Sequence, residues 1–422
     1  MIKSFLKWTV LSVLAVSLIS CASTNIKNID EQEGFVFYQD EANLWKQVDE
    51  FHAVMERSGF VYQDKELEEY VNSIADKMFG EILKKYNFDL RVYLIKDPIF
   101  NAGAYPNGVI YVNTSILATL ENEAQLATIL AHEGTHVIHR HALKTQNFLI
   151  NKTAFYKFFD ITMAGATGAV RGGVVGNSLS IARLIGGLGI AGAIYGYSRV
   201  LEEEADEYAY KFIVDAGYDP RESKKAYQNI STALEEEKIK APYFYSTHPK
   251  IKQRVRNFEQ YLKSYEKENK EAFQKVINEE VYMGKVKDLI LENAELELKR
   301  NKLNSAIAQL KRYNRYFKNS PESYDLLGRI YVAKMEFKKH NKNKDKGGKT
   351  DDSLDHKQAA MDAFGQANQI NPDYPHAYKH LGLLYYKKGE RQKASGLFKK
   401  YMDLNPQAED GEYIRGYIHE SE

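Results

Sequence analysis

The sequence has a single cysteine, no surplus of charge of either sign and no uninterrupted apolar run of membrane-spanning length. With Cys21 as the only thiol, no disulfide can form within the chain. The 58 basic and 57 acidic side chains nearly cancel, and the lysine-rich stretches alternate with acidic residues, as on solvated helix faces. This balance argues against nucleic acid as a partner.

The longest apolar segment, between Met163 and Tyr197, is rich in glycine, alanine and isoleucine, but Arg171 and Arg183 interrupt it. Its uncharged part begins at Leu184 and is shorter than the about 20 residues that a transmembrane helix needs. We therefore expect buried or cleft-lining helices here rather than a membrane span.

The N-terminus has the pattern of a secretory signal. Lys3 and Lys7 precede the apolar run Trp8–Ile19, which is too short to cross about 30 Å of hydrocarbon as a permanent helix. Residues 18–21 closely resemble a bacterial lipobox, in which the cysteine carries the lipid. We expect residues 1–20 to be cleaved and Cys21 to be lipidated; the alternative is an unmodified cysteine after ordinary cleavage.

The residues after Cys21 indicate where such an anchor would lie. Ala22 and Ser23 differ from the aspartate that resembles an inner-membrane retention signal in lipoproteins. In a cell with two membranes, we therefore expect the outer membrane, with the protein facing the periplasm. Residues 21–38 are mostly polar and predict a short tether.

Residues 130–142 contain a metal-binding pattern. His132 and His136 are four residues apart, so both imidazoles lie on one helical face and can share a tetrahedral Zn²⁺ ion. Glu133 stands where its carboxylate can touch a water molecule on the metal. The upstream residues 123–130 are helix formers at helical spacing, with no proline or glycine before Gly134, so the pattern lies on a predicted helix.

Two histidines that share Zn²⁺, with a glutamate beside the metal-bound water, are the pattern of a zinc peptidase. Such a site needs a third protein ligand, which a second predicted helix, residues 198–216, can supply. Glu202 and Asp206 are four residues apart on one face of this helix. Glu202 can bind the metal, while Asp206 can accept the far N–H of a ligand imidazole and fix its tautomer.

The neighbouring polar residues are expected to be structural or, for the two glutamates, solvated. Glu203 and Glu204 point to other sides of their helix. His139 and His141 follow the metal pattern but are not needed as ligands, because His132, His136 and Glu202 already provide three.

The chain as a whole predicts a mostly helical α+β fold. Helical patterns surround a small β section that leads directly into the metal helix. The predicted peptidase domain, residues 39–275, comprises helices over 39–83, a strand at 90–95, a hairpin of 101–105 and 109–113, the two metal helices and a helix over 250–274.

Residues 284–418 predict an all-α domain of tetratricopeptide repeats. The last repeat matches the 34-residue signature at Tyr378, Leu381, Gly382, Tyr385, Ala394, Phe398, Tyr401 and Pro406. The preceding repeat is split by a polar insertion, about residues 340–356, that we expect to be disordered. A weaker pair between Ala294 and Tyr313 is in phase, which makes three repeats.

These motifs together resemble the HtpX/BepA-type zinc metallopeptidase family, which also includes the CAAX prenyl endopeptidases. Four ordered motifs between Phe51 and Tyr261 carry the resemblance: Asn101–Gly108, His132–His141, Ser198–Asp206, and Thr247–Pro249 with Arg254. With the lipobox and the repeats, the layout is similar to periplasmic BepA-like quality-control proteases. The resemblance implies a gluzincin-type domain that binds one Zn²⁺ per chain.

The resemblance also implies roles outside the ligand set. The strand with Asn101, Ala102, Gly103 and Ala104 would line the cleft, where an extended substrate can pair with its free edge. His248, with Arg254 in the same motif, could steady the transition state or occupy the open metal position as a gate; the alternative is a histidine that caps the following helix.

Two residues depart from the family pattern. Gly103 stands where relatives often have a large apolar residue, which bears on substrate preference. Gly134 is unusual within a metal helix and costs about 1 kcal/mol of helix stability.

The sequence thus predicts a metalloendopeptidase. Glu133 would act as general base on unfolded or misassembled envelope proteins, and the repeats would recruit clients or an assembly machine. A second hypothesis makes the repeats a chaperone or adaptor whose metal site is rarely active. A third, a membrane-embedded prenyl-protein processing enzyme, is disfavoured by the interrupted apolar segment and the secretory signal.

Overall fold

The computed structural model describes residues 26–31, 39–148, 197–237, 251–268, 275–342 and 352–421. The predictions for the signal peptide, Cys21, nearly all of the apolar segment after Met163, and His248 therefore lie outside the described residues. Within these ranges, no helix is both long enough and apolar enough to cross a membrane.

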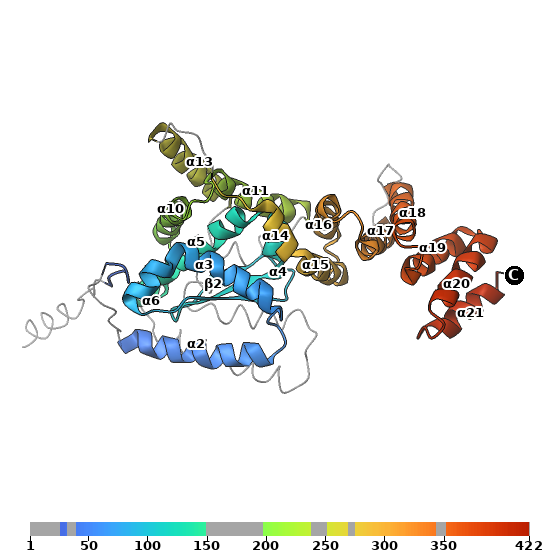
Figure 1. Ribbon diagram of the computed structural model, residues 1–422, viewed down its shortest axis with the longest axis horizontal. Coiled ribbons are helices and arrows are strands. Elements are labelled where there is room, and N and C mark those ends of the chain that lie inside the picture. The colour runs from blue at the N-terminus through green and yellow to red at the C-terminus, as the bar shows by residue number, and fades with distance from the viewer. Residues whose placement is uncertain are drawn as a thin grey trace, which may run out of the picture.

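The N-terminal part of the described chain combines a three-stranded sheet with helices on both of its faces (Figure 1). Its helices are α2 (Gln39–Arg57), α3 (Lys65–Tyr86), α4 (Thr114–Thr119), α5 (Glu123–Ile138), α6 (His141–Phe148), α10 (Arg199–Asp215), α11 (Arg221–Glu236) and α13 (Ile251–Glu268). Its strands are β1 (Arg91–Ile95), β2 (Ala102–Ala104) and β3 (Val109–Asn113).

Strand β3 lies in the centre of the sheet, parallel to β1 and antiparallel to β2. The predicted hairpin of β2 and β3 is confirmed. Its turn needs a glycine, because Gly108 has φ +86° and an added Cβ would collide with the Asp89 carbonyl oxygen at 2.0 Å. Strand β2 is left at one edge of the sheet.

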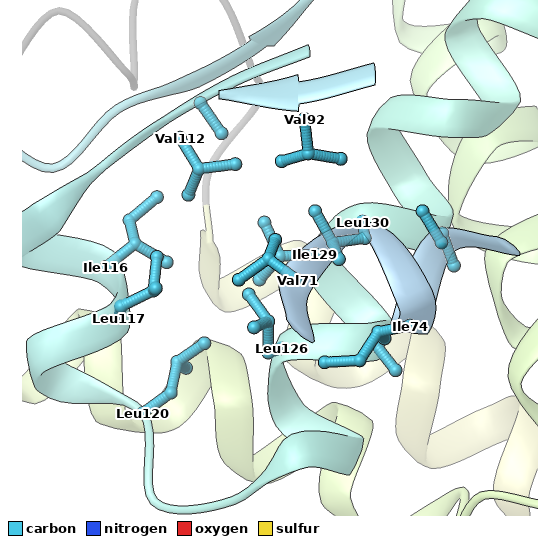
Figure 2. Close-up of a cluster of buried hydrophobic side chains, with 14 of the residues drawn as sticks. Val71, Ile74, Val92, Val112, Ile116, Leu117, Leu120, Leu126, Ile129 and Leu130 are labelled. Atoms are coloured by element: carbon cyan, nitrogen blue, oxygen red, sulfur yellow. The ribbon is translucent and has the colours of Figure 1, made fainter. Parts of the chain in front are cut away.

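Alternation along the strands directs one face of the sheet towards α3 and α5. Val92 and Val112 point into a cluster that also contains Val71 of α3 and Ile129 and Leu130 of α5 (Figure 2). The metal helix is therefore the central support of this core.

Helix α5 begins with a side-chain cap and is buried along its whole length. Asn122 accepts a hydrogen bond from the backbone N–H of Gln125 at 3.0 Å. The next residue, Glu123, accepts from the hydroxyls of Tyr70 and Tyr218, each at 2.8 Å. A carboxylate at this position also suits the positive end of the helix dipole.

Helix α2 covers the opposite face of the sheet (Figure 1). His52 Nδ1 lies 2.6 Å from the Tyr111 hydroxyl of β3, and Glu41 forms a buried ion pair with Arg140 at 3.0 Å. Part of the segment predicted as a tether packs against the end of α5: Ile26 and Ile29 are buried, Ile29 belongs to the core cluster of α3 and α5, and its N–H donates to the Ile138 carbonyl. These two isoleucines bury apolar surface that a free tether would leave in water.

The C-terminal helices form antiparallel pairs that extend away from the sheet (Figure 1). They are α14 (Glu279–Lys285), α15 (Lys287–Lys299), α16 (Leu303–Tyr316), α17 (Pro321–Lys342), α18 (Asp352–Ile370), α19 (Pro375–Lys388), α20 (Arg391–Leu404) and α21 (Gly411–His419). Helices α17 and α18 extend into both ends of the segment predicted as an insertion, because helical pairing continues beyond the signature positions.

Glycines allow close contact within two of these pairs. A Cβ on Gly328 of α17 would lie 2.4 Å from the Phe364 ring of α18, and one on Gly382 of α19 would lie 2.7 Å from the Phe398 ring of α20. This repeated glycine–phenylalanine contact accounts for the spacing that the sequence shows, and the C-terminal part is an all-α repeat array.

The first of the C-terminal helices share the core around α5. Tyr282, Leu289 and Tyr313 belong to the same buried cluster as the α5 side chains. Arg312 of α16 is buried and donates to the carbonyl oxygens of Thr119 and Ala118 at the end of α4. Helices α14–α16 are therefore packed against the core around α5, and α16 contacts the element that precedes the metal helix.

Candidate metal centre

The two histidines of the metal pattern and Glu202 converge at one buried point. His132 Nε2 and His136 Nε2 lie 3.0 Å apart. The Glu202 carboxylate, from α10, places Oε2 3.5 Å from His132 Nε2 and Oε1 3.6 Å from His136 Nε2. All three side chains are at most 2% exposed. The predicted ligands, which lie on two helices, are thus brought together.

These separations fit a metal ion bound at the centre of the three groups. Ligand atoms at about 2.0–2.1 Å from a tetrahedral Zn²⁺ ion lie about 3.3 Å from each other, close to the three distances here. Two imidazoles and one carboxylate form a typical donor set for a catalytic site that keeps its fourth position open. His132, His136 and Glu202 could therefore hold zinc.

Helix α10 is placed by its own cap and by packing against α5. The Ser198 hydroxyl accepts from the backbone N–H of Leu201 at 3.4 Å. Ala205 and Ala209 are fully buried on the face that carries Glu202. Small side chains there let the two helices approach closely, so that a short carboxylate reaches the histidines.

Tyr197 lies against the site, although none of the sequence motifs assigns it a role. Its ring stacks on His136 with centroids 4.0 Å apart and an interplanar angle of 15°. Burial, reinforced by the negative charges of Glu133 and Glu202, raises the pKa of Tyr197 well above its ordinary value. The phenol is therefore protonated at neutral pH and can serve as a hydrogen-bond donor.

Glu133 is 1% exposed and follows the first histidine on α5. Its negative charge contributes to the raised pKa values of both Tyr197 and Tyr227. A buried carboxylate beside an open metal position is suited to accept a proton from water.

Asp206 supports His132 from the side away from the ligand triangle. Its Oδ1 lies 3.1 Å from His132 Nδ1. Arg254 of α13 donates two hydrogen bonds to the same oxygen, and its guanidinium carbon lies 4.0 Å from the centre of the Tyr227 ring. Burial alone would lower the pKa of Arg254, but the charges of Asp206 and Glu202 outweigh it and raise that pKa. Arg254 thus lies behind the centre.

A second group of polar side chains lies beyond His136. His139 Nδ1 is 2.5 Å from Glu204 Oε1, and His141 Nε2 is 3.6 Å from Glu204 Oε2. Burial lowers the pKa of His141 to about 4, so this imidazole is neutral at neutral pH. The hydrogen bond from His139 and the nearby His141 imidazole hold the pKa of Glu204 below its usual range.

The predicted substrate strand lies beside the metal centre. Ala104 and Tyr105, at the end of β2, line a small cavity together with His136, Val137 and Tyr197. Ala102 is buried, whereas Gly103 and Ala104 are half-buried. Asn101 precedes the strand and accepts a backbone hydrogen bond from Asn113.

A mostly helical domain with a small sheet, an H-E-x-x-H helix and a glutamate from a second helix defines a metallopeptidase fold. Residues 62–262 match the sequence model of Peptidase family M48. This segment is a metallopeptidase domain of that family.

Curated relatives agree with this family assignment. Over 173 residues the chain is 30% identical to the mitochondrial metalloendopeptidase OMA1 of Schizosaccharomyces pombe, covering 40% of this chain and 46% of that protein. It is 24% identical to the beta-barrel assembly-enhancing proteases of Yersinia pestis and Escherichia coli K12, covering 46% and 37% of this chain and 39% and 31% of those proteins. The chain thus spans less than half the length of each of these relatives.

Among solved structures, a tetratricopeptide-repeat protein of Thermus thermophilus is 21% identical, with a TM-score of 0.27, and the likeness covers 40% of this chain and 73% of that one. The assignment of repeats to this chain rests instead on its own helix pairs and their glycine–phenylalanine contacts.

Proposed function

We propose that the protein is a zinc-dependent endopeptidase that cleaves unfolded or misassembled proteins of the cell envelope. The observation that carries the proposal is the triangle of His132 Nε2, His136 Nε2 and the Glu202 carboxylate, with the buried Glu133 next to His132 on the same helix. Three ligands leave one position for water, and the donor set suits zinc.

In the proposed mechanism of peptide hydrolysis, each residue of the site has a separate role. Bound zinc would polarise the scissile carbonyl and lower the pKa of a water molecule towards about 7. Glu133 takes the proton of the attacking water and passes it to the leaving amine nitrogen. Asp206 holds His132 with the proton on Nδ1, so that Nε2 keeps its lone pair for the metal. Arg254, which touches neither substrate nor metal in this account, positions Asp206.

The free edge of β2 supports extended polypeptide as the substrate. In the described part of the chain, β2 pairs only with β3, and its end shares a cavity with His136. A substrate strand that adds to this edge would satisfy unpaired backbone groups and run past the metal centre. Such pairing requires an unfolded segment, which gives selectivity for misfolded chains without a sequence motif.

The remaining parts of the proposal concern location and recruitment. A lipid on Cys21 would hold the protein at the outer membrane, facing the periplasm, and His248 would steady the transition state or gate the site. The repeat helices α17–α20 would bind envelope proteins and present them, because stacked helix pairs form extended peptide-binding surfaces.

Metal content and cleavage of casein by the purified protein test the activity. We expect about one zinc per chain, cleavage that a chelator abolishes, and recovery on adding zinc back. A zinc-loaded protein that does not cleave casein, but prevents its aggregation through the repeats, would overturn the proposal in favour of a chaperone or adaptor.

A further inference from the structure

The far nitrogens of the two metal-binding imidazoles have different partners. His132 Nδ1 faces the Asp206 carboxylate at 3.1 Å. His136 Nδ1 instead lies 2.8 Å from Nδ1 of another histidine, His141, which is fully buried. Two imidazole nitrogens at this distance share one proton, so one ring must donate and the other accept.

Glu204 decides which ring donates. Its Oε2 lies 3.6 Å from His141 Nε2, at the other end of that ring. A carboxylate facing Nε2 favours the tautomer with the proton on Nε2, because the negative charge attracts the N–H and repels the lone pair. His141 Nδ1 then carries a lone pair and can only accept.

We propose that His141 and Glu204 form a relay that positions His136 for metal binding. With His141 Nδ1 as acceptor, His136 must carry its proton on Nδ1, which leaves the Nε2 lone pair directed at the ligand triangle. Glu204 thus fixes two successive tautomers, and no proton is transferred. The inference rests on the proposed metal centre and deepens it, since it assigns a positioning role to His141.

The same side chains could be read as a second metal site, because one ligand atom from each of His139, His141 and Glu204 lies within 4.8 Å of the others. Three observations favour the relay. His139 Nδ1 is only 2.5 Å from Glu204 Oε1, shorter than the about 3.3 Å between two ligands of one ion. The Lys144 ammonium lies 3.9 Å from the same oxygen and would repel a cation. His141 Nδ1 is already paired with His136.

The test measures zinc affinity by competition with a chromogenic chelator, on the full chain and independently of cleavage. His141→Phe keeps a ring of similar size but removes the acceptor, and we expect zinc to bind about 10–100-fold more weakly. Glu204→Gln, which removes the charge, should weaken binding by a smaller factor. His141→Gln retains an acceptor and should recover part of the affinity.

Glu203→Gln is the matched control, because Glu203 lies on the same helix, pairs with Arg199 and is 43% exposed. It should bind zinc as the wild type does. Saturating zinc should restore most of the cleavage by His141→Phe, since a positioning defect acts through metal occupancy.

Unchanged zinc affinity in folded His141→Phe would overturn the relay. If His141→Phe fails to fold, the zinc affinity of Glu204→Gln is the test. Wild-type zinc affinity in Glu204→Gln would also overturn the relay. If the wild type binds two zinc ions and Glu204→Gln binds only one, then His139, His141 and Glu204 form a second metal site and not a relay. If the wild type binds zinc but does not cleave casein, the proposed function fails while these affinities still test the relay.

Discussion

Arg254 and Asp206 form a buried pair behind the metal centre: two guanidinium nitrogens lie 2.9 and 2.6 Å from one carboxylate oxygen, and each side chain is 2% exposed. The same oxygen lies 3.1 Å from His132 Nδ1. The pair therefore links the stability of the fold to the orientation of a metal ligand, which allows the two effects to be measured separately.

Arg254→Met is expected to destabilise the protein by about 3–5 kcal/mol, because it leaves the Asp206 carboxylate buried without its cation. Removing both charges with Arg254→Met and Asp206→Asn should cost less than the single change at Arg254. Denaturant unfolding checks this ordering. Arg256→Met, two residues along the same helix on an exposed position, is the control and should stay within about 0.5 kcal/mol of wild type.

Asp206→Asn should weaken zinc binding by about 10–100-fold with little loss of fold, since an amide of the same shape replaces the group that fixes the His132 tautomer. Chelator competition measures the affinity. Wild-type affinity in this variant would show that Asp206 does not orient His132.

Gly134→Ala is expected to destabilise the protein although alanine is the better helix former. A Cβ there would lie 2.4 Å from the Phe79 ring, which is fully buried and packs edge-on against Phe212 at 4.8 Å. Overpacking of about 1–3 kcal/mol should outweigh the about 1 kcal/mol that alanine contributes to a helix.

The matched control is Gly80→Ala in α3, where nothing lies within 4 Å of an added Cβ. It should be neutral or stabilise by up to about 1 kcal/mol. Phe79→Leu should relieve part of the cost of Gly134→Ala. Equal stability of the two alanine variants in thermal unfolding would contradict the packing argument.

Gly134 also illustrates what the sequence could and could not predict. Spacing alone placed His132, Glu133 and His136 on one helix and Glu202 with Asp206 on another, because these relations repeat every turn. The partner of Gly134 is Phe79, on a different helix, and no local periodicity encodes that contact. The glycine has a physical reason only once α3 is packed against α5.

Long-range polar contacts could not be predicted either, because local periodicity does not encode contacts between different helices. Arg254 was recognised through a family motif, but its pairing with Asp206 depends on how α13 crosses α10. Tyr197 and His141 both contact His136, although they are far apart in the sequence. A tyrosine immediately before the Ser198 helix cap was the one local signal for Tyr197. The merging of α14–α16 with the peptidase core likewise depends on packing rather than repeat spacing.

Glu297 should make stability depend on pH. Burial raises the pKa of this glutamate to about 8 from its ordinary 4.5, although Ser305 and Gln309 donate hydrogen bonds to it. Because the folded pKa is the higher one, the folded state holds the proton more tightly. The stability contributed by this group is full below about pH 4.5, falls as pH rises to about 8, and is level above that.

Glu297→Gln should remove this dependence, because the amide keeps the acceptor oxygen and carries no charge at any pH. Urea midpoints near pH 5.5 and about pH 8.5 measure the change with pH, which should be larger in the wild type than in the variant. Glu295→Gln, on the partly exposed side of the same helix, controls for the amide substitution. Identical pH dependence in wild type and Glu297→Gln would contradict the assignment.

The most direct test of the central claim is Glu133→Gln. The amide has the size of the carboxylate but cannot take a proton from water, so we predict about one zinc per chain, as in wild type, with casein cleavage lowered by about 10²–10⁴-fold. Glu203→Gln should retain both zinc and cleavage. Undiminished cleavage by zinc-loaded Glu133→Gln would contradict the account, because the base in the proposed mechanism would then lie elsewhere.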